Sequence, residues 1–324
     1  MYTSEELLNH VNEALDSIAY DRQPWTLYEP IHYVLSLGGK RIRPVLMLLA
    51  YNLYREDPLT IMQQAIGVET YHNFTLLHDD LMDRADMRRG HETVHKRWDA
   101  NRAILSGDTM LLQAFERVMD CDADKLKAVM ALFVQTTFEI GEGQQFDVEF
   151  ETRNDVTEAE YIEMIRLKTS VLLACALKMG GIMAEASADD QQRLYRLGEQ
   201  IGLAFQLQDD LLDVYGDPKL FGKNIGGDIT SNKKTYMLIN ALNLANPMQR
   251  QALQRWIDMP RFDRQEKVAA VTALYDAIGI RQLCEDRINY YFERGCRELD
   301  MLSVDDDRKT ELRRYIAQMM NRQS

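Results

Sequence analysis

The chain has little proline and no long apolar run, and each shortage carries information. Only seven prolines occur in 324 residues, and none lies between Pro58 and Pro218. Because proline interrupts helices, an interval this long without it favours long helices. No apolar stretch reaches the ~18 to 20 residues that a helix needs to cross a bilayer. We therefore expect no transmembrane segment.

Cysteine is also scarce. The four cysteines lie far apart and form no Cys-x-x-Cys pair, which is typical of reduced thiols inside a cell rather than of disulfides or a zinc site. The first twenty residues begin acidic and become amphipathic, unlike a signal or transit peptide. We therefore expect a cytoplasmic protein.

Basic residues are outnumbered, 38 Lys and Arg against 51 Asp and Glu, which gives a net charge of −13. This balance supplies no general basic surface and argues against a nucleic-acid partner. An anionic substrate would have to be attracted by local cations or by bound metal.

Apolar residues recur at spacings of three and four throughout, as at Met110, Ala114 and Val118, which indicates helices. Neither a sustained strand alternation nor a Ser- or Pro-rich linker is present. We predict one all-α domain over residues 1–324, with ten or more helices. Breaks between helices are predicted at Gly38-Gly39, near Pro58, at Gly180-Gly181, after Tyr215, near Asn246-Pro247 and near Met259-Pro260.

The segment LLHDDLMDRADMRRG (76–90) contains a cluster of aspartates after an apolar run. On a helix, Asp79 and Asp83 share one face and Asp80 is rotated away from it. Two carboxylates on one face repel each other unless a cation lies between them, and Mg²⁺ suits one or two carboxylates together with phosphate oxygens. The alternative is a solvated helix end.

Arg84, Arg88 and Arg89 follow this first cluster directly. Their guanidinium groups are either ion-paired with the aspartates or available to phosphate oxygens, for which bidentate geometry suits them.

The pattern recurs in FQLQDDLLDVYGD (205–217). Asp209 and Asp213 repeat the spacing, and Gln206 precedes them on nearly the same face. Two copies on separate apolar helices are stronger evidence for metal-binding carboxylates than either copy alone. If they faced each other across a bundle, they could hold a polyanion through several cations.

Cations form two further groups. LGGKRIRPVL (37–46) places Lys40, Arg41 and Arg43 at an expected helix start, where backbone amides and three cations would form an anion site; an exposed basic turn is the alternative. Lys168-Thr169 lies in an apolar helix, where an unpaired lysine is costly. Lys223 and Lys233 flank the loop after the second cluster. This inventory suits two phosphorylated substrates.

These segments resemble the trans-type isoprenyl diphosphate synthases, which include farnesyl and geranylgeranyl diphosphate synthases. The matching pieces, in family order, are GGKRIRP, HDDLMDRADMRRG, GDTMLLQAF, GQQFD, KTS, FQLQDDLLDVYGD and GKNIGGDI…KKT. The resemblance covers residues 38–235 and implies a helical bundle with a central active-site cavity. Residues 240–324 carry no matching motif and are expected to be packing helices.

The resemblance also implies roles for individual residues. Two or three Mg²⁺ ions on the allylic diphosphate would be held by Asp79, Asp83, Asp209 and Asp213. The same substrate would be contacted by Arg88, Lys168, Thr169, Gln206, Lys223 and Lys233, and isopentenyl diphosphate by Lys40, Arg43, His72 and Arg89. Catalysis would rest on Asp79, Asp83, Lys168, Asp209 and Lys233.

The chain departs from the family at Asn232, where glycine often precedes the final lysine. Lys233 and Lys234 are adjacent, so the sequence does not decide which one reaches diphosphate. The implied reaction ionises the allylic diphosphate, joins the cation to the double bond of isopentenyl diphosphate and loses a proton. It needs a dry cavity and no side-chain nucleophile.

Product length would depend on an apolar shaft below Asp79, and in the family bulky residues form its floor. By resemblance, Phe74 with Tyr71 beneath it would stop a short chain. Thr75 is not aromatic, and the first motif lacks the two-residue insertion of many bacterial farnesyl synthases, which together favour a C20 product over C15. The alternative is that both rings are ordinary core aromatics.

Four alternatives stay open. A terpene cyclase also uses an Asp-Asp-x-x-Asp cluster, but its second metal motif differs and it needs no isopentenyl site. A head-to-head synthase such as squalene synthase is disfavoured by Lys40 and Arg43. A catalytically silent helical binding subunit would have broken aspartate motifs, and a plain Mg²⁺ or Ca²⁺ scaffold would not need diphosphate. A homodimer is expected by resemblance.

Overall fold

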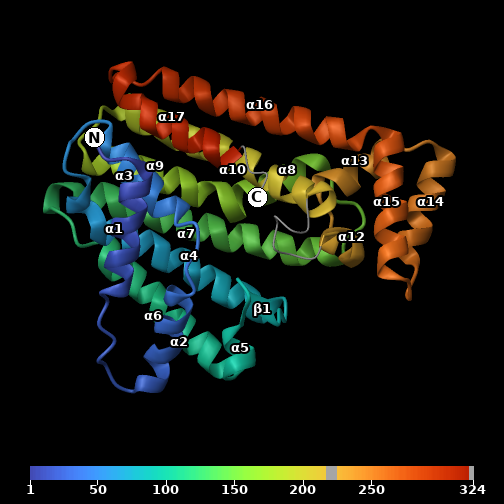
Figure 1. Ribbon diagram of the computed structural model, residues 1–324, viewed down its shortest axis with the longest axis horizontal. Helices are drawn as coiled ribbons and strands as arrows, with labels where there is room; N and C mark the ends of the chain where they lie inside the picture. The colour runs from blue at the N-terminus through green and yellow to red at the C-terminus, as the bar shows by residue number, and fades with distance from the viewer. Residues whose placement is uncertain (217–224, 321–324) are drawn as a thin grey trace. The chain divides into compact units, whose positions relative to one another are not determined.

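The computed structural model describes residues 1–216 and 225–320, and these are almost entirely helical (Figure 1). The predicted all-α fold class is confirmed. The two longest described helices, α7 (Ala123–Thr152) and α10 (Ala188–Tyr215), both lie in the interval without proline. The strands in the described residues are β1 (Met87–Arg88) and β2 (His91–Glu92), a two-residue antiparallel hairpin that the sequence did not predict.

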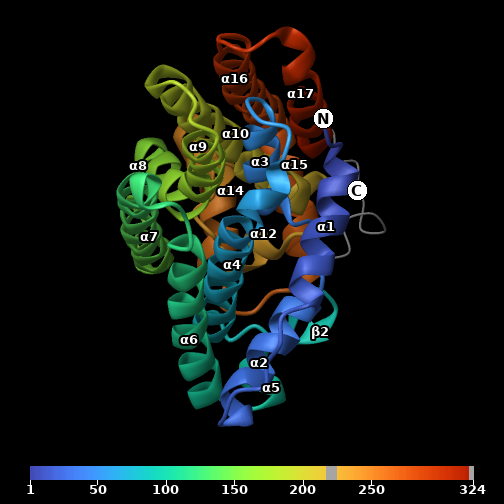
Figure 2. The ribbon, with the colours of Figure 1, turned by 90° about the vertical axis from the view of Figure 1, so that its left-hand side faces the viewer.

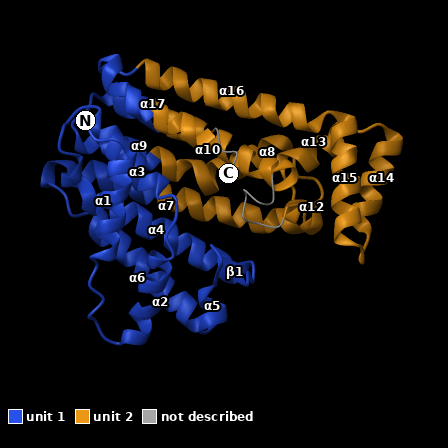
Figure 3. Ribbon diagram, viewed as in Figure 1, with its two compact units in different colours: residues 1–135, 175–195, 302–312 blue, residues 136–174, 196–301, 313–324 orange. Residues whose placement is uncertain are grey.

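The described chain folds into two compact units, which Figure 3 colours separately. Unit 1 comprises residues 1–135, 175–195 and 302–312, and unit 2 comprises residues 136–174, 196–301 and 313–324. The remaining helical elements, in chain order, are α1 (Ser4–Asp16), α2 (Trp25–Ser36), α3 (Ile42–Asn52), the 3₁₀ turn η1 (Pro58–Ile61), α4 (Met62–Met82), α5 (Val94–Arg97), α6 (Ala100–Val118), α8 (Glu158–Ile165), the π-helical turn η2 (Arg166–Ser170), α9 (Val171–Met183), α12 (Gly227–Ser231), α13 (Tyr236–Leu244), α14 (Pro247–Asp258), α15 (Arg264–Ile278), α16 (Ile280–Asp300) and α17 (Asp306–Met320).

Unit 1 is built around α4, which packs along α6 and also contacts α3 and α2 (Figure 2). Every residue of α3 from Pro44 to Asn52 is buried. A helix that is buried on all sides must be surrounded by other elements, so α3 is an internal helix of this unit. It carries the Lys40–Arg43 segment at its start, as the sequence predicted.

The predicted break at Gly180-Gly181 is wrong, because both glycines lie inside α9, which ends at Met183. A Cβ atom on Gly180 would lie 2.3 Å from the carbonyl oxygen of Met47 in α3. The glycine is therefore explained by the close approach of two helices and not by a turn.

Unit 2 has its own apolar core, to which α8, α10, α13, α15 and α16 contribute. The predicted break at Asn246-Pro247 is confirmed. Asn246 accepts a hydrogen bond from the backbone N–H of Gln249, whose side chain bonds back to the backbone of Asn246, and Pro247 occupies the first turn of α14. This capping box starts the helix. Among the described residues, no helix combines the length and hydrophobicity that a membrane crossing requires.

Candidate active site

The first aspartate cluster lies at the carboxyl end of α4, in unit 1. Asp83 follows the helix directly, and its backbone N–H donates to the carbonyl oxygen of Asp79 at 2.9 Å. Asp83 is exposed, and the Asp79 side chain keeps 18% of its surface accessible. Asp80, by contrast, is 5% exposed. The structure therefore separates the cluster into two accessible carboxylates and one buried one, as the predicted rotation of Asp80 requires.

Asp80 is held by Arg88 from the β1–β2 hairpin. The Arg88 Nε donates to both carboxylate oxygens at 2.8 Å, and Nη2 lies 2.7 Å from Oδ1. Burial raises the pKa of Asp80, and Arg88 opposes that shift. The same guanidinium lies 3.8 Å from Asp79 Oδ2. Arg88 is thus ion-paired with an aspartate, which is one of the two alternatives left open by the sequence. The pairing also places the Arg88 guanidinium beside Asp79.

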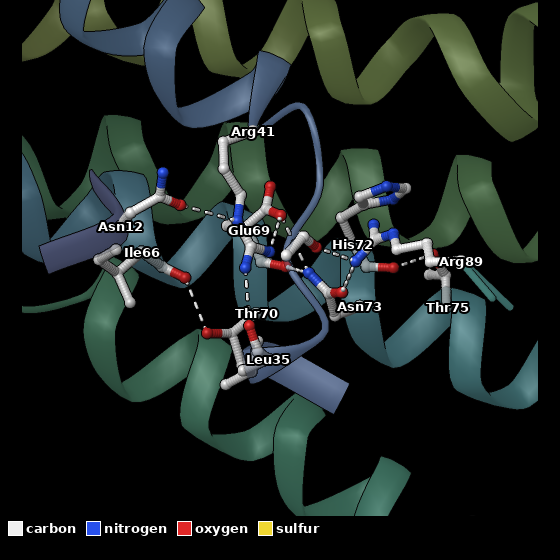
Figure 4. A network of polar contacts seen from close by, with 11 residues as sticks. Asn12, Leu35, Arg41, Ile66, Glu69, Thr70, His72, Asn73, Thr75 and Arg89 are labelled. Atoms are coloured by element: carbon white, nitrogen blue, oxygen red, sulfur yellow. Dashed lines mark hydrogen bonds and ion pairs between the residues drawn. The ribbon is translucent and has the colours of Figure 1, made fainter. Parts of the chain in front are cut away.

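A buried network, drawn in Figure 4, joins α3, α4 and the turn of the hairpin. Arg41 donates to Glu69 Oε1 at 2.8 Å and to the carbonyl of Leu35 at 2.6 Å. Asn73 donates to the same Glu69 oxygen at 3.0 Å and accepts from Arg89 at 3.5 Å. Arg41 and Glu69 are both almost wholly buried. The prediction that Arg41 forms part of an anion site is therefore wrong, since its guanidinium faces a buried carboxylate.

His72 lies on the face of α4 beside this network (Figure 4). Its pKa is lowered well below the usual value by burial and then by the positive charges of Arg43, Arg89, Arg88 and Arg41. Arg41 and Arg88 are ion-paired with Glu69 and Asp80. The positive charges of Arg43 and Arg89 beside an uncharged imidazole favour binding of an anion. Three of the four residues predicted for the isopentenyl site thus gather at one place in unit 1.

Lys40, the fourth of those residues, is exposed next to Gly39 at the start of α3. A Cβ atom on Gly39 would lie 2.9 Å from Cζ of Arg89. The glycine therefore lets the α3 start approach the hairpin arginine.

Aromatic side chains continue along α4 below Asp79. The ring centroids of Tyr71 and Phe74 are 5.4 Å apart, those of Phe74 and His78 are 4.8 Å apart, and Phe133 of α7 lies 5.4 Å from Tyr71. The hydroxyl of Thr75 donates to the carbonyl of His72 at 2.8 Å. Phe74 thus stands between the aspartate end of α4 and the buried Tyr71, in the order that the sequence predicted.

The second aspartate cluster lies on α10, in unit 2. Asp210 is 2% exposed and accepts hydrogen bonds from the hydroxyl of Tyr161 and, at 3.3 Å, from Gln206. The hydroxyl of Thr169 donates to the Gln206 side-chain oxygen at 3.2 Å. Burial, with the nearby carboxylate of Asp228, raises the pKa of Asp210 to about 7. Thr169 and Gln206, two of the residues predicted to contact the allylic substrate, are therefore joined to the cluster.

Asp209 and Asp213 flank Asp210 on the same helix and are both partly exposed. One oxygen of Asp213 accepts the backbone N–H of Asp228 at 2.9 Å, at the start of α12. Asp213 thereby ties the start of α12 to the helix that carries the cluster.

Lys168 lies in the π-helical turn η2 and pairs with Asp147 of α7 at 2.6 Å. Burial acts to raise the pKa of Asp147, but Lys168 and Lys233 outweigh it, so this pKa is lowered. A Cβ atom on Gly143 would lie 2.3 Å from the backbone nitrogen of Lys168. In the GQQFD segment, Gly143 therefore leaves room for the backbone of Lys168, and Asp147 supplies its counter-charge.

The adjacent lysines after α12 point to different partners. Lys234 donates to the carbonyl of Glu151 at 2.9 Å. Lys233 acts electrostatically on Asp147 and on Asp210. The cation that faces the second cluster is thus Lys233. Lys223 lies outside the described residues.

Sequence reasoning missed Glu69, Asn73, Asp147 and Tyr161. Of these four residues, only Asp147 had a signal in the sequence, because a lysine in an apolar helix requires a carboxylate partner.

The donor set at both clusters fits a hard divalent cation, since Mg²⁺ binds through one or two carboxylates and completes its shell with phosphate oxygens and water. Within residues 1–216 and 225–320, no three Asp, Glu, His or Cys side chains are already assembled as a metal site.

Comparison with known proteins agrees with these arrangements. The sequence model of the family described as Polyprenyl synthetase matches residues 24–276. A geranylgeranyl diphosphate synthase of Methanosarcina mazei is 35% identical over 97% of this chain and 95% of its own length. A geranylfarnesyl diphosphate synthase of Natronomonas pharaonis is 39% identical over 71% of this chain and 73% of its own. A crystal structure of a geranylgeranyl pyrophosphate synthase superposes with a TM-score of 0.94 at 42% identity, with both chains fully covered. The chain belongs to the polyprenyl synthetase family, as a short-chain isoprenyl diphosphate synthase.

Proposed function

We propose that this prenyltransferase condenses isopentenyl diphosphate with an allylic diphosphate of five to fifteen carbons, and that its main product is geranylgeranyl diphosphate. The observation that carries the proposal is the approach of Arg89 to the start of α3, where a Cβ atom on Gly39 would lie 2.9 Å from the Arg89 Cζ, with His72 and Arg43 beside it. An anion site apart from the aspartate clusters is required by an enzyme that holds two diphosphates at once, whereas a terpene cyclase has no use for one.

We assign the allylic diphosphate to the two aspartate clusters acting together. Asp79, Asp83, Asp209 and the second oxygen of Asp213 would hold two or three Mg²⁺ ions. When bound, these ions supply Lewis-acid neutralisation of the leaving diphosphate. The ligand assignment is supported by the accessible carboxylates at the carboxyl end of α4 and by the position of Asp209 next to the anchored Asp210.

Protein cations complete the neutralisation. Lys168 is oriented by Asp147, and Arg88 is oriented by Asp80. Lys233 acts electrostatically on Asp147. Charges fixed in advance where the leaving group becomes negative lower the barrier because they need no reorganisation during the reaction. Lys223 belongs to the same proposed group. Thr169 and Gln206 are joined by a hydrogen bond and would line the path of the allylic carbon chain.

Isopentenyl diphosphate would bind at Lys40, Arg43, His72 and Arg89. Its double bond attacks the allylic carbocation, and the released diphosphate accepts the proton that is lost. The neutral state of His72 suits a hydrogen-bond contact to this substrate, because the positive charge is supplied by its arginine neighbours.

The proposed product length follows from the aromatic side chains of α4. Phe74, whose ring is tilted against that of buried Tyr71, would close the shaft after about four isoprene units, and Thr75 would leave room beside it. The relatives carry names for C20 and C25 products, so similarity alone does not decide the length.

We propose further that residues 1–324 act as one synthase domain in the cytoplasm, with the motifs in 38–235 and packing helices in 240–324. A homodimer is supported by α6 and the residue that follows it, where Leu105, Leu112 and Met119 are 57%, 70% and 49% exposed and recur every seven residues. A second copy of the same helix would cover this stripe.

The test is incubation with Mg²⁺, isopentenyl diphosphate and each allylic primer of five, ten or fifteen carbons, followed by product sizing. We expect a C20 diphosphate from all three primers. Condensation to another length would overturn the product assignment only. Cyclic hydrocarbon from the primer alone would favour the cyclase, and folded protein that converts no primer would favour the silent subunit.

A further inference from the structure

A buried lysine of α15 reaches the residue that precedes Lys233. Lys267 is 1% exposed, and its ammonium donates to the side-chain oxygen of Asn232 at 2.6 Å. The same ammonium lies 4.1 Å from the ring centroid of Phe262. Burial lowers the pKa of Lys267. Burying a lysine with only an amide oxygen as its hydrogen-bond acceptor costs folding free energy. An apolar side chain at this position would therefore serve stability at least as well.

Asn232 ends α12 in the left-handed conformation, with φ 55° and ψ 35°. Glycine adopts this conformation without a steric cost, and asparagine is among the few other residues that tolerate it. This is the position at which the family often has glycine. The departure from the family pattern therefore preserves the backbone conformation and adds a side chain.

That side chain is fixed at both ends. Its amide nitrogen donates to the carbonyl of Ile257 in α14 at 3.1 Å, and its oxygen accepts from Lys267 in α15. Exchanging the two ends of the amide would place a donor against an ammonium and an acceptor against a carbonyl, so the orientation is determined by its partners. The Asn232 side chain is thus held by both α14 and α15. A glycine at this position would make neither contact.

The next residue, Lys233, depends on this turn. Its N–H donates to the carbonyl of Asp228 at 2.9 Å, and its carbonyl accepts from Thr235 at 2.8 Å. Its ammonium acts on Asp147 and Asp210, at the second cluster. Where that ammonium can reach follows from the backbone direction that Asn232 sets.

We propose that Lys267 is a positioning residue, which acts through Asn232 to fix Lys233 for the diphosphate of the allylic substrate. The proposal rests on the proposed function for the identity of that substrate. Lys267 itself does not touch the reacting atoms. Replacing Lys267 should therefore weaken binding of the allylic substrate and not of isopentenyl diphosphate, and this effect should require Asn232.

The experiment is a double-mutant cycle of Lys267→Met and Asn232→Gly, with the KM of each substrate measured separately. Lys267→Met should raise the KM of the allylic diphosphate roughly tenfold and leave that of isopentenyl diphosphate within about twofold. Asn232→Gly should raise the allylic KM similarly, and the double variant should be no worse than either single variant, because both changes remove the same link.

Lys309→Met is the matched control. Lys309 is also a buried lysine, 4% exposed, but it pairs with Asp306 of α17. It should change thermal stability without changing the ratio of the two KM values. Additive effects in the cycle, or equal changes for both substrates, would overturn the proposal. If Lys267→Met does not fold, Asn232→Gly still decides, since an unchanged allylic KM refutes the link.

The cycle is repeated by calorimetric titration with inorganic diphosphate and Mg²⁺. A wild-type protein that fails to condense any primer overturns the proposed function, whereas the binding cycle still tests the coupling of Lys267 to Asn232. Weakened diphosphate binding that does not add across the two changes supports the positioning role. Unchanged binding in both single variants contradicts it.

Discussion

The two aspartate clusters have the same spacing, yet their middle carboxylates are held in opposite ways. Asp80 in unit 1 is paired with the guanidinium of Arg88. Asp210 in unit 2 accepts from two neutral groups, the hydroxyl of Tyr161 and the amide of Gln206. Asp80 thus fixes a cation beside Asp79, whereas Asp210 fixes Gln206 and, through it, Thr169. A repeated motif does not imply repeated chemistry at each of its positions.

The last members of the clusters differ as well. Asp83 lies beyond the end of α4 and is exposed, whereas Asp213 lies within α10 and has one oxygen bonded to the backbone of Asp228. The first cluster therefore ends in an accessible carboxylate, and the second ends in a carboxylate that also binds the backbone at the start of α12.

The largest effect should come from the outer aspartates, where the two clusters are expected to behave alike. Asp79→Asn and Asp209→Asn should each lower kcat by about 10³-fold, because each removes a negative ligand of the ions that neutralise the leaving group. Steady-state assays at saturating Mg²⁺ measure this, with exposed Asp124→Asn as the control. If either variant kept more than a tenth of wild-type kcat, that cluster would not be a metal site.

The middle aspartates should separate the clusters by stability. Asp80→Asn leaves Arg88 without its counter-charge and should cost about 2 kcal/mol of unfolding free energy. Asp210→Asn leaves only neutral donors and should cost about 1 kcal/mol. Urea unfolding without Mg²⁺ provides the comparison. Equal losses would mean that the nature of the partner does not matter, and the contrast drawn above would be wrong.

A smaller effect is expected from Asp147, which serves the second cluster only. Asp147→Asn removes the counter-charge that holds Lys168 and should lower kcat about tenfold. The KM of isopentenyl diphosphate should stay the same, since the residues proposed to bind it lie with the first cluster. A parallel rise in both KM values would point to general unfolding of the site instead.

Product length should respond at the first cluster with the smallest change in rate. Phe74→Ala opens the space above Tyr71 and should lengthen the product by one or more five-carbon units, while kcat falls by less than about threefold. Chromatographic sizing of the dephosphorylated products measures this. An unchanged product length would reduce Phe74 to an ordinary core aromatic.

Much of the fold could be predicted because its signals are local. The Asn246-Pro247 helix start needs only neighbouring residues, and the long helices follow from the missing prolines. Gly180-Gly181 was misread because glycine in a turn and glycine at a helix contact look the same in sequence. The β1–β2 hairpin, two residues on each strand, is too short for any alternation to be visible.

Site residues could be predicted where a motif repeats in the sequence. They could not be predicted where a side chain's partner lies far away along the chain. Arg41 was assigned to the anion site because its partner Glu69 lies 28 residues away, on another helix. Tyr161 and Asp210 are 49 residues apart. Such pairs are set by tertiary packing, so spacing along the chain gives no indication of them.

The central claim is that the two clusters hold one diphosphate together through Mg²⁺. Calorimetric binding of an allylic thiolodiphosphate, which resists ionisation, tests it in the Asp79→Asn, Asp209→Asn and double variants. The account predicts that each single change abolishes most of the Mg²⁺-dependent affinity and that the double change adds little. Fully additive losses, or unchanged affinity in either single variant, would contradict it.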